Sequence, residues 1–450
     1  MAGKMVEGNL DILIEGGMLI TMGEGDDIID DPRIGIAGGR IVFVESGLFG
    51  TSGTYRAAEI IDARGSIVMP GLINTHTHLP MICFRGMADD LPLMSWLNGH
   101  IFPAEARYVN RDMVYAGSLL AMAEMILSGT TTFCDSYFFE SSVAHAAMAS
   151  GMRAVVALGF IDVQVLDSPE RSRQLEIAEG FISRWSSRSP LVTPALCCHS
   201  PYTCSPETLT AVKGAARKAG VPFVIHLAET KEEIHLLRER YNRTPVGHLK
   251  DLVVLDGKTM AVHCNWLDEE DMDIMAGADV KVCHNPESNM KLAAGMAHIP
   301  SLLDRGVRVG LGTDGCASNN DLDMFREMGT AARIHKVIEM DPTVMDAATV
   351  LRMATLDGAR VLGLDDRTGS IEPGKEADII LVDLRKPHLT PVHNCRSQLV
   401  YAASGADVAT SIIGGKIVMK DRKLLTIDPA SAMSEVRKIA AVIAADRIAR

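Results

Sequence analysis

Eight short apolar segments in the middle of the chain constrain its fold more than any other feature. Each reads as a strand, and longer helical patterns such as RDMVYAGSLLAMAEMILSG lie between them. Strands that alternate with helices are typical of βαβ units in a parallel sheet, and eight such units close into a barrel. We therefore predict an α/β fold with a (β/α)8 TIM barrel. The segments are GLINTHTH, TTTFCD, RAVVALGFID, LVTPALCCHS, VPFVIHLAE, KTMAVHCN, DVKVCHNP and VRVGLGTD.

Nearly every one of these segments has a histidine, aspartate or asparagine at or near its end. The carboxyl ends of barrel strands meet at one face, where such residues read as catalytic. An open doubly wound sheet would also place its site at strand ends, but it needs a topological switch and usually fewer strands. We expect the strand-end groups to converge at the mouth of a closed barrel. They are His76, His78, His199, His226, His263 and Asp314.

His76 and His78 are separated by one residue, so in a strand their side chains point to the same face. In a chain with 14 histidines such a pair also arises by chance, and a catalytic zinc site needs at least one more ligand. Burial of so many ionisable groups is unfavourable without a partner, and a divalent cation is the simplest compensation. Imidazoles with one carboxylate suit zinc best, with iron and nickel as alternatives, and such an ion would activate water.

Both ends of the chain have a different texture from the middle. Strand-like segments bounded by Gly, Ser or Pro fill the N-terminus, and EADIILVDL and DVATSIIGGKIVMKDRKLL suggest strands and a Gly-Gly hairpin near the C-terminus. A chain of 450 residues is long enough for a second, smaller domain. We predict a composite β-sandwich domain of residues 1–66 and 370–450, and a metal-dependent catalytic barrel of residues 67–369.

Composition and motifs exclude several classes of function. The net charge of -13 argues against nucleic-acid binding, and we find no signal peptide or apolar stretch long enough for a membrane. The nine cysteines form no CxxC pair, which favours reduced thiols. Residues 310–315 match GxGxxG, but they follow the last strand rather than the first, so they do not indicate a dinucleotide loop. We expect a cytoplasmic homo-oligomer with a small-molecule substrate and no nucleic-acid or membrane partner.

Several motifs, taken in order, resemble those of the amidohydrolase superfamily, and within it the 5-methylthioadenosine/S-adenosylhomocysteine deaminases. They are PGLINTHTH, RGMADDLPLMSWL, HLAET, VHCN, CHNPESNMKLAAG and GTDGCASNNDLDMF, and the match covers essentially the whole chain. The resemblance implies a metal-dependent hydrolase that converts the 6-amino group of an adenosine-type nucleoside to the inosine analogue plus ammonia. The nucleoside would be S-adenosylhomocysteine, 5'-methylthioadenosine, 5'-deoxyadenosine or adenosine.

The resemblance also implies roles for particular residues. One divalent metal would be held by His76, His78, His226 and Asp314. Catalysis would use Asp314 to take a proton from water, Glu229 to relay a proton to N1, and His263 to hydrogen-bond the attacking oxygen. Substrate contacts would come from Glu105 at the ribose hydroxyls and from His199, Glu229 and Trp96. Residues 83–97 form a candidate lid, in which Leu91, Met94 and Trp96 would exclude water.

Two features distinguish this chain from parts of the superfamily. Some members carry a substrate-binding arginine in the third strand, where this chain has Leu158, so the choice of nucleoside stays open. The fourth strand offers no lysine for a second metal, which favours a mononuclear site.

Alternative functions are a deaminase or chlorohydrolase of a triazine, guanine or pterin, and a non-catalytic scaffold. Glu229 favours deamination over dechlorination, and the intact set of ionisable residues disfavours the scaffold.

Overall fold

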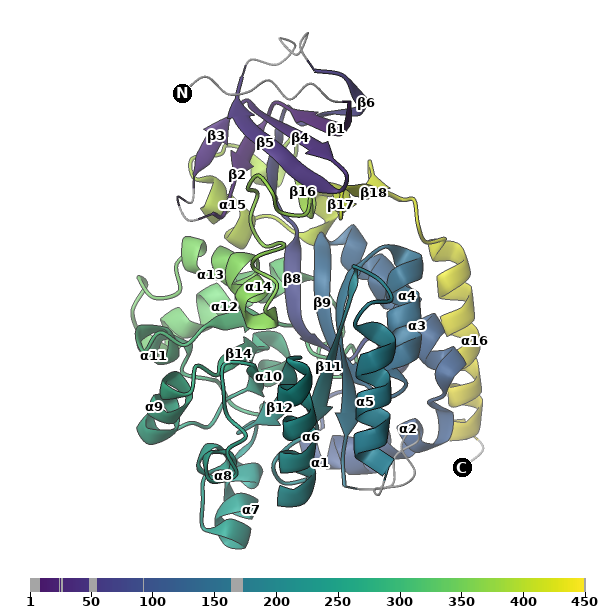
Figure 1. Ribbon diagram of the computed structural model, residues 1–450, viewed down its shortest axis with the longest axis vertical. Coiled ribbons are helices and arrows are strands. Elements are labelled where there is room, and N and C mark those ends of the chain that lie inside the picture. The colour runs from purple at the N-terminus through teal and green to yellow at the C-terminus, as the bar shows by residue number, and fades with distance from the viewer. Residues whose placement is uncertain are drawn as a thin grey trace.

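The computed structural model describes residues 9–448 except 24, 26, 48–54, 92 and 163–172. Figure 1 shows a β-rich part, built from the first and last strands of the chain, above a larger part in which helices surround a sheet. Within the described residues, we find no helix with the length and the apolar run that a membrane span requires.

The larger part is a parallel eight-stranded sheet whose strands follow the order of the sequence. The Asp314 amide donates to the His76 carbonyl at 3.0 Å, and the Thr75 hydroxyl donates to the Leu311 carbonyl at 2.9 Å. These bonds join the last strand to the first, and the predicted barrel is confirmed. The strands are β8 (Leu72–Thr77), β9 (Thr130–Tyr137), β10 (Arg153–Phe160), β11 (Val192–Cys198), β12 (Phe223–Leu227), β13 (Thr259–His263), β14 (Lys281–His284) and β15 (Val309–Leu311).

Helices cover the outside of the barrel, and local sequence explains where several of them begin. Asn110 caps the helix predicted from RDMVYAGSLLAMAEMILSG, because its side chain accepts from the amides of Asp112 and Met113. Ser205 caps another helix in the same way, and Gly220 ends it in the left-handed conformation. The main covering helices are α3 (Arg111–Leu127), α4 (Glu140–Ser150), α5 (Gln174–Trp185), α6 (Pro206–Ala219), α7 (Lys231–Tyr241), α9 (Glu269–Gly277) and α12 (Met324–Glu339).

The smaller part contains two sheets with a core of their own. That core includes Ile14, Leu19 and Ile379, which are fully buried and come from both sheets. One sheet has the order β5-β4-β1-β6, and the other β19-β18-β17-β16-β7-β2-β3. Their strands are β1 (Leu10–Glu15), β2 (Met18–Ile20), β3 (Ile28–Asp30), β4 (Pro32–Ala37), β5 (Arg40–Ser46), β6 (Ala57–Asp62), β7 (Ser66–Pro70), β16 (Ile379–Asp383), β17 (Val408–Ile413), β18 (Lys416–Lys420) and β19 (Lys423–Leu424).

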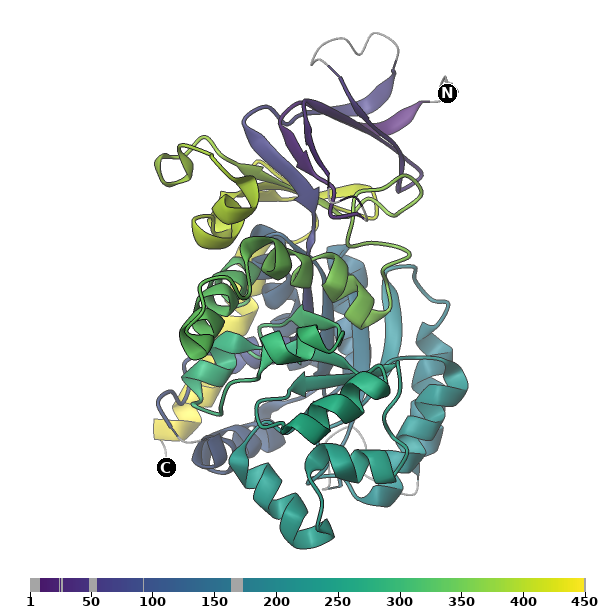
Figure 2. The same cartoon turned by 90° about the vertical axis from the view of Figure 1, so that its left-hand side faces the viewer.

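The second sheet pairs strands from opposite ends of the chain. β7 lies between β16 and β2, and Gly414 and Gly415, both with positive φ, turn β17 into β18. The predicted Gly-Gly hairpin is therefore confirmed. The C-terminal helix α16 (Pro429–Ile448) leaves this sheet and packs along α3 of the barrel (Figures 1 and 2). The domain boundaries at residues 66 and 370 stay a prediction.

A buried ion-pair network links the barrel to the composite sheet. Arg153, at the start of β10, is fully buried. Its guanidinium donates to Asp378 at 2.7 and 3.0 Å and to Glu376 at 2.6 Å. Asp378 also accepts from Thr368 and from the Gly414 amide. Because these acids directly precede β16, the network ties the entry of the sheet's central strand to the barrel.

Replacement of Arg153 by leucine should destabilise the fold strongly, because it leaves the Asp378 carboxylate buried without its cation. We expect the free energy of unfolding to fall by about 3–5 kcal/mol, measured by urea denaturation. Lys218→Ala is the matched control: Lys218 and its partner Glu179 are 79% and 58% exposed, so its loss should stay below about 1 kcal/mol. Equal losses in both variants would contradict the argument.

Candidate active site

A cavity of about 950 Å³, its open mouth included, lies at the carboxyl ends of the barrel strands. Its inner end is polar and its walls are mostly apolar, an arrangement that suits a small ligand with one polar edge. The polar groups at the inner end are His78, His199, His226, His263, Glu229 and Asp314. The apolar walls include Leu93, Trp96, Leu97, Ile101, Phe102, Phe138, Phe160 and Ile161.

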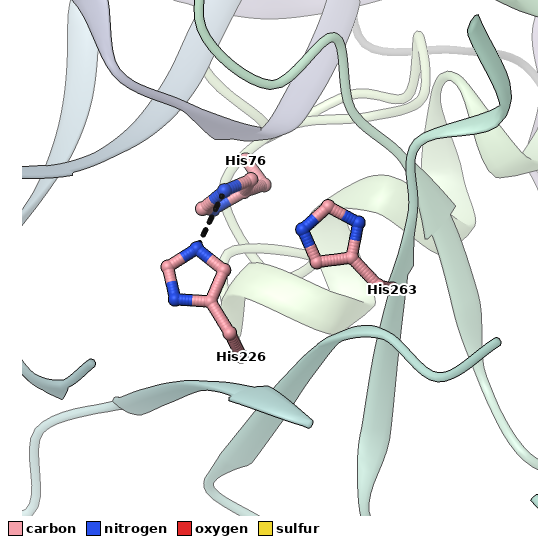
Figure 3. Close-up of side chains that lie close together, drawn as sticks. All are labelled: His76, His226 and His263. Atoms are coloured by element: carbon pink, nitrogen blue, oxygen red, sulfur yellow. Dashed lines mark hydrogen bonds between the residues drawn. The ribbon is translucent and has the colours of Figure 1, made fainter. Parts of the chain in front are cut away.

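The four side chains predicted as metal ligands lie together at this inner end. Asp314 Oδ1 is 3.5 Å from His76 Nε2 and 3.4 Å from His78 Nε2, and His226 Nε2 is 3.3 Å from His76 Nε2 (Figure 3). His263 faces the same point, so that His76, His226 and His263 form a second compact group that overlaps the triad of His76, His78 and Asp314.

Hydrogen bonds to backbone carbonyls orient two of these imidazoles. His226 Nδ1 donates to the His199 carbonyl at 2.8 Å, and His78 Nδ1 donates to the Ser136 carbonyl at 2.5 Å. Each ring therefore directs its Nε2 inward, as metal-binding histidines do. Burial lowers the pKa of His76 to about 4 and that of His226 well below its usual value, which keeps both rings neutral. Converging neutral imidazoles beside a carboxylate are chemically suited to a divalent cation.

Asp314 is held rigidly although it lies on an irregular segment. Its Oδ2 accepts from the hydroxyls of Ser288 and Ser318 at 2.7 and 2.8 Å, and its Oδ1 accepts from the Gly315 amide at 2.8 Å. Burial opposes its ionisation, but the hydrogen bond to His76 and the proximity of His78 and His263 hold the pKa of Asp314 well below its usual range. The group is therefore a carboxylate that lies at the candidate metal site.

Glu229 lies just beyond β12 and projects into the same cavity. Its backbone is fixed by Glu233, whose two carboxylate oxygens accept from the amides of Ala228 and Glu229 at 2.9 and 3.0 Å. The Glu229 carboxyl lies 3.8 Å from His263 Nε2. Burial raises the pKa of Glu229, so this acid holds a proton at higher pH than an exposed glutamate and is suited to proton transfer.

The predicted substrate contacts also line the cavity. Glu105 is buried and accepts from the Tyr137 hydroxyl at 2.6 Å. His199 Nδ1 lies 2.9 Å from the Thr203 hydroxyl, and burial lowers the pKa of His199 to about 4. Trp96 is buried in the wall. The structure thus brings all nine predicted site residues to one cavity or its floor.

Two further predictions concern Leu158 in the third strand and the candidate lid. Leu158 is buried in the core, whereas Gly159 and Phe160 at the end of the third strand, and Ile161 just after it, line the cavity. The candidate lid, residues 83–97, begins at the end of a 3-10 helix, Leu79–Phe84, and contains α1 (Leu93–Trp96), whose Leu93 and Trp96 form part of the wall. The side chain of Met94 lies outside the described residues.

The structure adds polar residues that the strand-end pattern did not single out. They are Tyr137, Asn265, Ser288, Asn289 and Ser318, and each hydrogen-bonds a predicted site residue directly. Four of them lie inside motifs already noted, VHCN, CHNPESNMKLAAG and GTDGCASNNDLDMF. Closeness in the sequence to a predicted site residue could therefore have pointed to these polar residues. It did not indicate which side chain each of them would contact.

Comparisons with known proteins agree with this geometry. Residues 67–418 match the amidohydrolase family. A 5-methylthioadenosine/S-adenosylhomocysteine deaminase of Syntrophobacter fumaroxidans is 49% identical over 96% of this chain and 98% of its own length. A 5'-deoxyadenosine deaminase of Methanosarcina mazei is 44% identical over 96% of this chain and 98% of its own length. The structure of an adenosine deaminase of Xanthomonas campestris, solved with bound zinc, matches with a TM-score of 0.94 and 37% identity. The match covers 97% of this chain and 99% of that protein's chain.

These similarities extend over nearly the full chain and include both of its parts. The chain belongs to the amidohydrolase family, in the branch of the 5-methylthioadenosine/S-adenosylhomocysteine deaminases. It is accordingly an enzyme, a hydrolase that cleaves carbon–nitrogen bonds in cyclic amidines. The cavity at the barrel mouth contains its candidate metal site.

A pH-dependent stability test addresses the burial of Glu105. Burial raises the pKa of Glu105 from 4.5 to about 7. The folded state then holds this proton more tightly than the unfolded state, so its contribution to the free energy of unfolding is present below pH 4.5 and lost as the pH rises to about 7. Relative to Glu105→Gln, the wild type should lose on the order of 3 kcal/mol across this window.

Urea denaturation at a series of pH values measures this difference. Glu207→Gln, at an exposed acid in the first turn of α6, provides the matched control and should leave the pH dependence as it is in the wild type. Parallel stability curves for the wild type and Glu105→Gln would show that Glu105 titrates alike in the folded and unfolded states.

Proposed function

We propose that this chain is a metal-dependent deaminase that hydrolyses the 6-amino group of 5'-modified adenosines or adenosine, and releases the inosine analogue and ammonia. One observation carries the proposal: a carboxyl group with a raised pKa, Glu229, shares a cavity with a cluster of imidazoles and the ionised Asp314. Hydrolysis with proton transfer requires one acid that holds a proton, here Glu229, and one that is ionised, here Asp314. The relatives named as deaminases support the same substrate class.

The metal belongs to this proposal as one divalent ion per chain, zinc first, held by His76, His78, His226 and Asp314. A bound divalent ion would lower the pKa of a water molecule towards about 7 and so supply a nucleophile at neutral pH. The neutral rings with inward Nε2 atoms, described above, suit this role. The bound zinc in the similar Xanthomonas campestris protein supports the choice of ion.

The remaining steps use the chain's own side chains. Protonated Glu229 donates to ring nitrogen N1, which makes C6 electrophilic, while Asp314 takes a proton from the attacking water. His263 hydrogen-bonds the attacking oxygen, and its place between Glu229 and His226 suits this contact. The water oxygen then bonds to C6, and Asp314 passes its proton to the amino nitrogen. The bond from C6 to that nitrogen breaks, ammonia leaves, and the remaining hydroxyl proton returns to Glu229 as C6 becomes a carbonyl. Trp96 and the apolar walls exclude bulk water from the reaction.

The substrate's ribose has a candidate partner across the cavity. Glu105 lies on α2 (Phe102–Tyr108), and the Tyr137 hydroxyl occupies one of its carboxylate oxygens, Oε1. The second oxygen is available to accept from sugar hydroxyls. The choice among S-adenosylhomocysteine, 5'-methylthioadenosine, 5'-deoxyadenosine and adenosine depends on the 5' substituent and stays open.

Glu229→Gln tests the proton transfer. Glutamine keeps the size of the side chain but carries no transferable acid proton, so kcat should fall by about 100- to 10,000-fold with the bound metal retained. Turnover is followed by the ultraviolet shift from adenine to hypoxanthine across a panel of 5'-modified adenosines. Glu232→Gln, at an exposed position of α7, is the control and should keep full activity.

Two outcomes would contradict different parts of this proposal. Full activity of Glu229→Gln would remove the proton-transfer role from that residue. Absence of turnover with every adenosine derivative, by wild-type protein with one metal ion per chain, would overturn the substrate class.

Metal removal provides a separate prediction. Chelation should abolish turnover and lower the unfolding temperature, and zinc should restore both. The stabilisation should reach about 2.7 kcal/mol when free zinc is about 100-fold above its Kd. His226→Ala should reduce the metal content measured by elemental analysis, whereas His235→Ala, at an exposed site on α7, should not. Full metal content in His226→Ala would exclude it from the ligand set.

A further inference from the structure

A chain of buried amide groups connects Glu229 to the ring of His263. Asn265 Nδ2 donates to the Glu229 carbonyl at 3.0 Å, and Asn289 Nδ2 donates to Asn265 Oδ1 at 2.8 Å. Asn289 Oδ1 then lies 2.9 Å from His263 Nδ1. The side chains of Asn265, Asn289 and His263 are no more than 2% exposed, so water does not compete for these bonds.

The direction of this chain is set at its Glu229 end. A backbone carbonyl only accepts, so Asn265 must present its amide nitrogen there and its oxygen to Asn289. Asn289 must therefore present nitrogen to Asn265 and oxygen to the imidazole. Because an amide oxygen also only accepts, His263 Nδ1 has to carry the hydrogen. Reversal of both amides would place the Asn265 oxygen against the Glu229 carbonyl oxygen, which is repulsive.

We propose that Asn265 and Asn289 are positioning residues that fix His263 as its Nδ1–H tautomer, so that Nε2 accepts a hydrogen from the attacking water. In a neutral imidazole with hydrogen on Nδ1, Nε2 carries the lone pair. Nε2 points towards the Glu229 carboxyl, 3.8 Å away. His263 therefore orients the nucleophile by accepting rather than by donating.

The same chain couples the two ends of the site mechanically. Glu229 is fixed through its carbonyl by Asn265 and through its amide by Glu233. Asn289 lies on α10 (Pro286–Lys291), next to Ser288, which donates to Asp314. One short helix therefore supports both His263 and Asp314. The kinetic consequence of the tautomer rests on the proposed deamination, but the tautomer itself does not.

The direct test is the protonation pattern of His263 in the full-length, zinc-loaded protein. Long-range nitrogen–proton NMR spectra of protein with 15N-labelled histidine distinguish the two ring nitrogens, and a His263→Gln sample identifies the signals. We expect a protonated Nδ1 and an unprotonated Nε2. A protonated Nε2 with a bare Nδ1 would overturn the proposal, whether or not any nucleoside is turned over.

Three variants test how the chain of amide groups acts on His263. Asn289→Asp keeps an acceptor opposite Nδ1 and should keep the tautomer, whereas Asn289→Leu should release it and lower kcat by roughly 10- to 100-fold with KM little changed. Asn265→Leu does not touch the ring, yet it should yield a mixture of tautomers because Asn289 can then rotate. An unchanged tautomer in both leucine variants would overturn the positioning role.

Asn242→Asp provides the control for these substitutions. Asn242 is an exposed residue that ends α7, and its replacement should change neither the spectrum of His263 nor kcat. If wild-type protein turns over no adenosine derivative, the proposed function fails while the spectra still decide the tautomer. The two proposals are therefore separable.

Discussion

The hydrogen bond from the Asp314 amide to the His76 carbonyl is the contact on which the rest of the structure depends. It joins the segment after the last barrel strand to the first strand, and it does so at two residues whose side chains meet at the candidate metal site. Closure of the fold and assembly of the site are thus one event, because neither residue can reach the other in an open sheet. Most other polar groups of the cavity lie on or just beyond the strands between these two, whereas Glu105 lies on α2 and Ser318 follows Asp314.

The sequence predicted the barrel and the convergence of its strand ends because both follow from local pattern. Apolar runs specify strands, and the parallel topology then brings residues such as His226 and Asp314 together without any knowledge of loops. The partners of those residues depend on how loops fold back. The amide chain through Asn265 and Asn289, and the contact of Tyr137 with Glu105, join segments whose spacing is set only by tertiary packing.

The backbone conformation at the site was a second feature that the sequence pattern did not predict. Ala228, His263, Cys264 and Asp314 all have positive φ angles, of 50°, 71°, 54° and 61°. Residues with a Cβ rarely adopt this region, and although aspartate and histidine do so more often than most, their types alone do not single out these positions. The surrounding bonds explain how it is maintained: the Cys264 amide donates to the Leu227 carbonyl at 3.0 Å, and the Trp266 amide donates to the Ala228 carbonyl at 3.0 Å. Strain of this kind collects where side chains must be aimed.

The position of β7 between β2 and β16 has a consequence for synthesis of the chain on the ribosome. The first strands emerge early, but the edge of β7 that faces β16 has no partner until more than 300 further residues have been made. An unpaired strand edge is prone to association with other chains. The C-terminal strands therefore protect a surface that the nascent protein exposes throughout elongation, and premature termination within the barrel would leave that edge open.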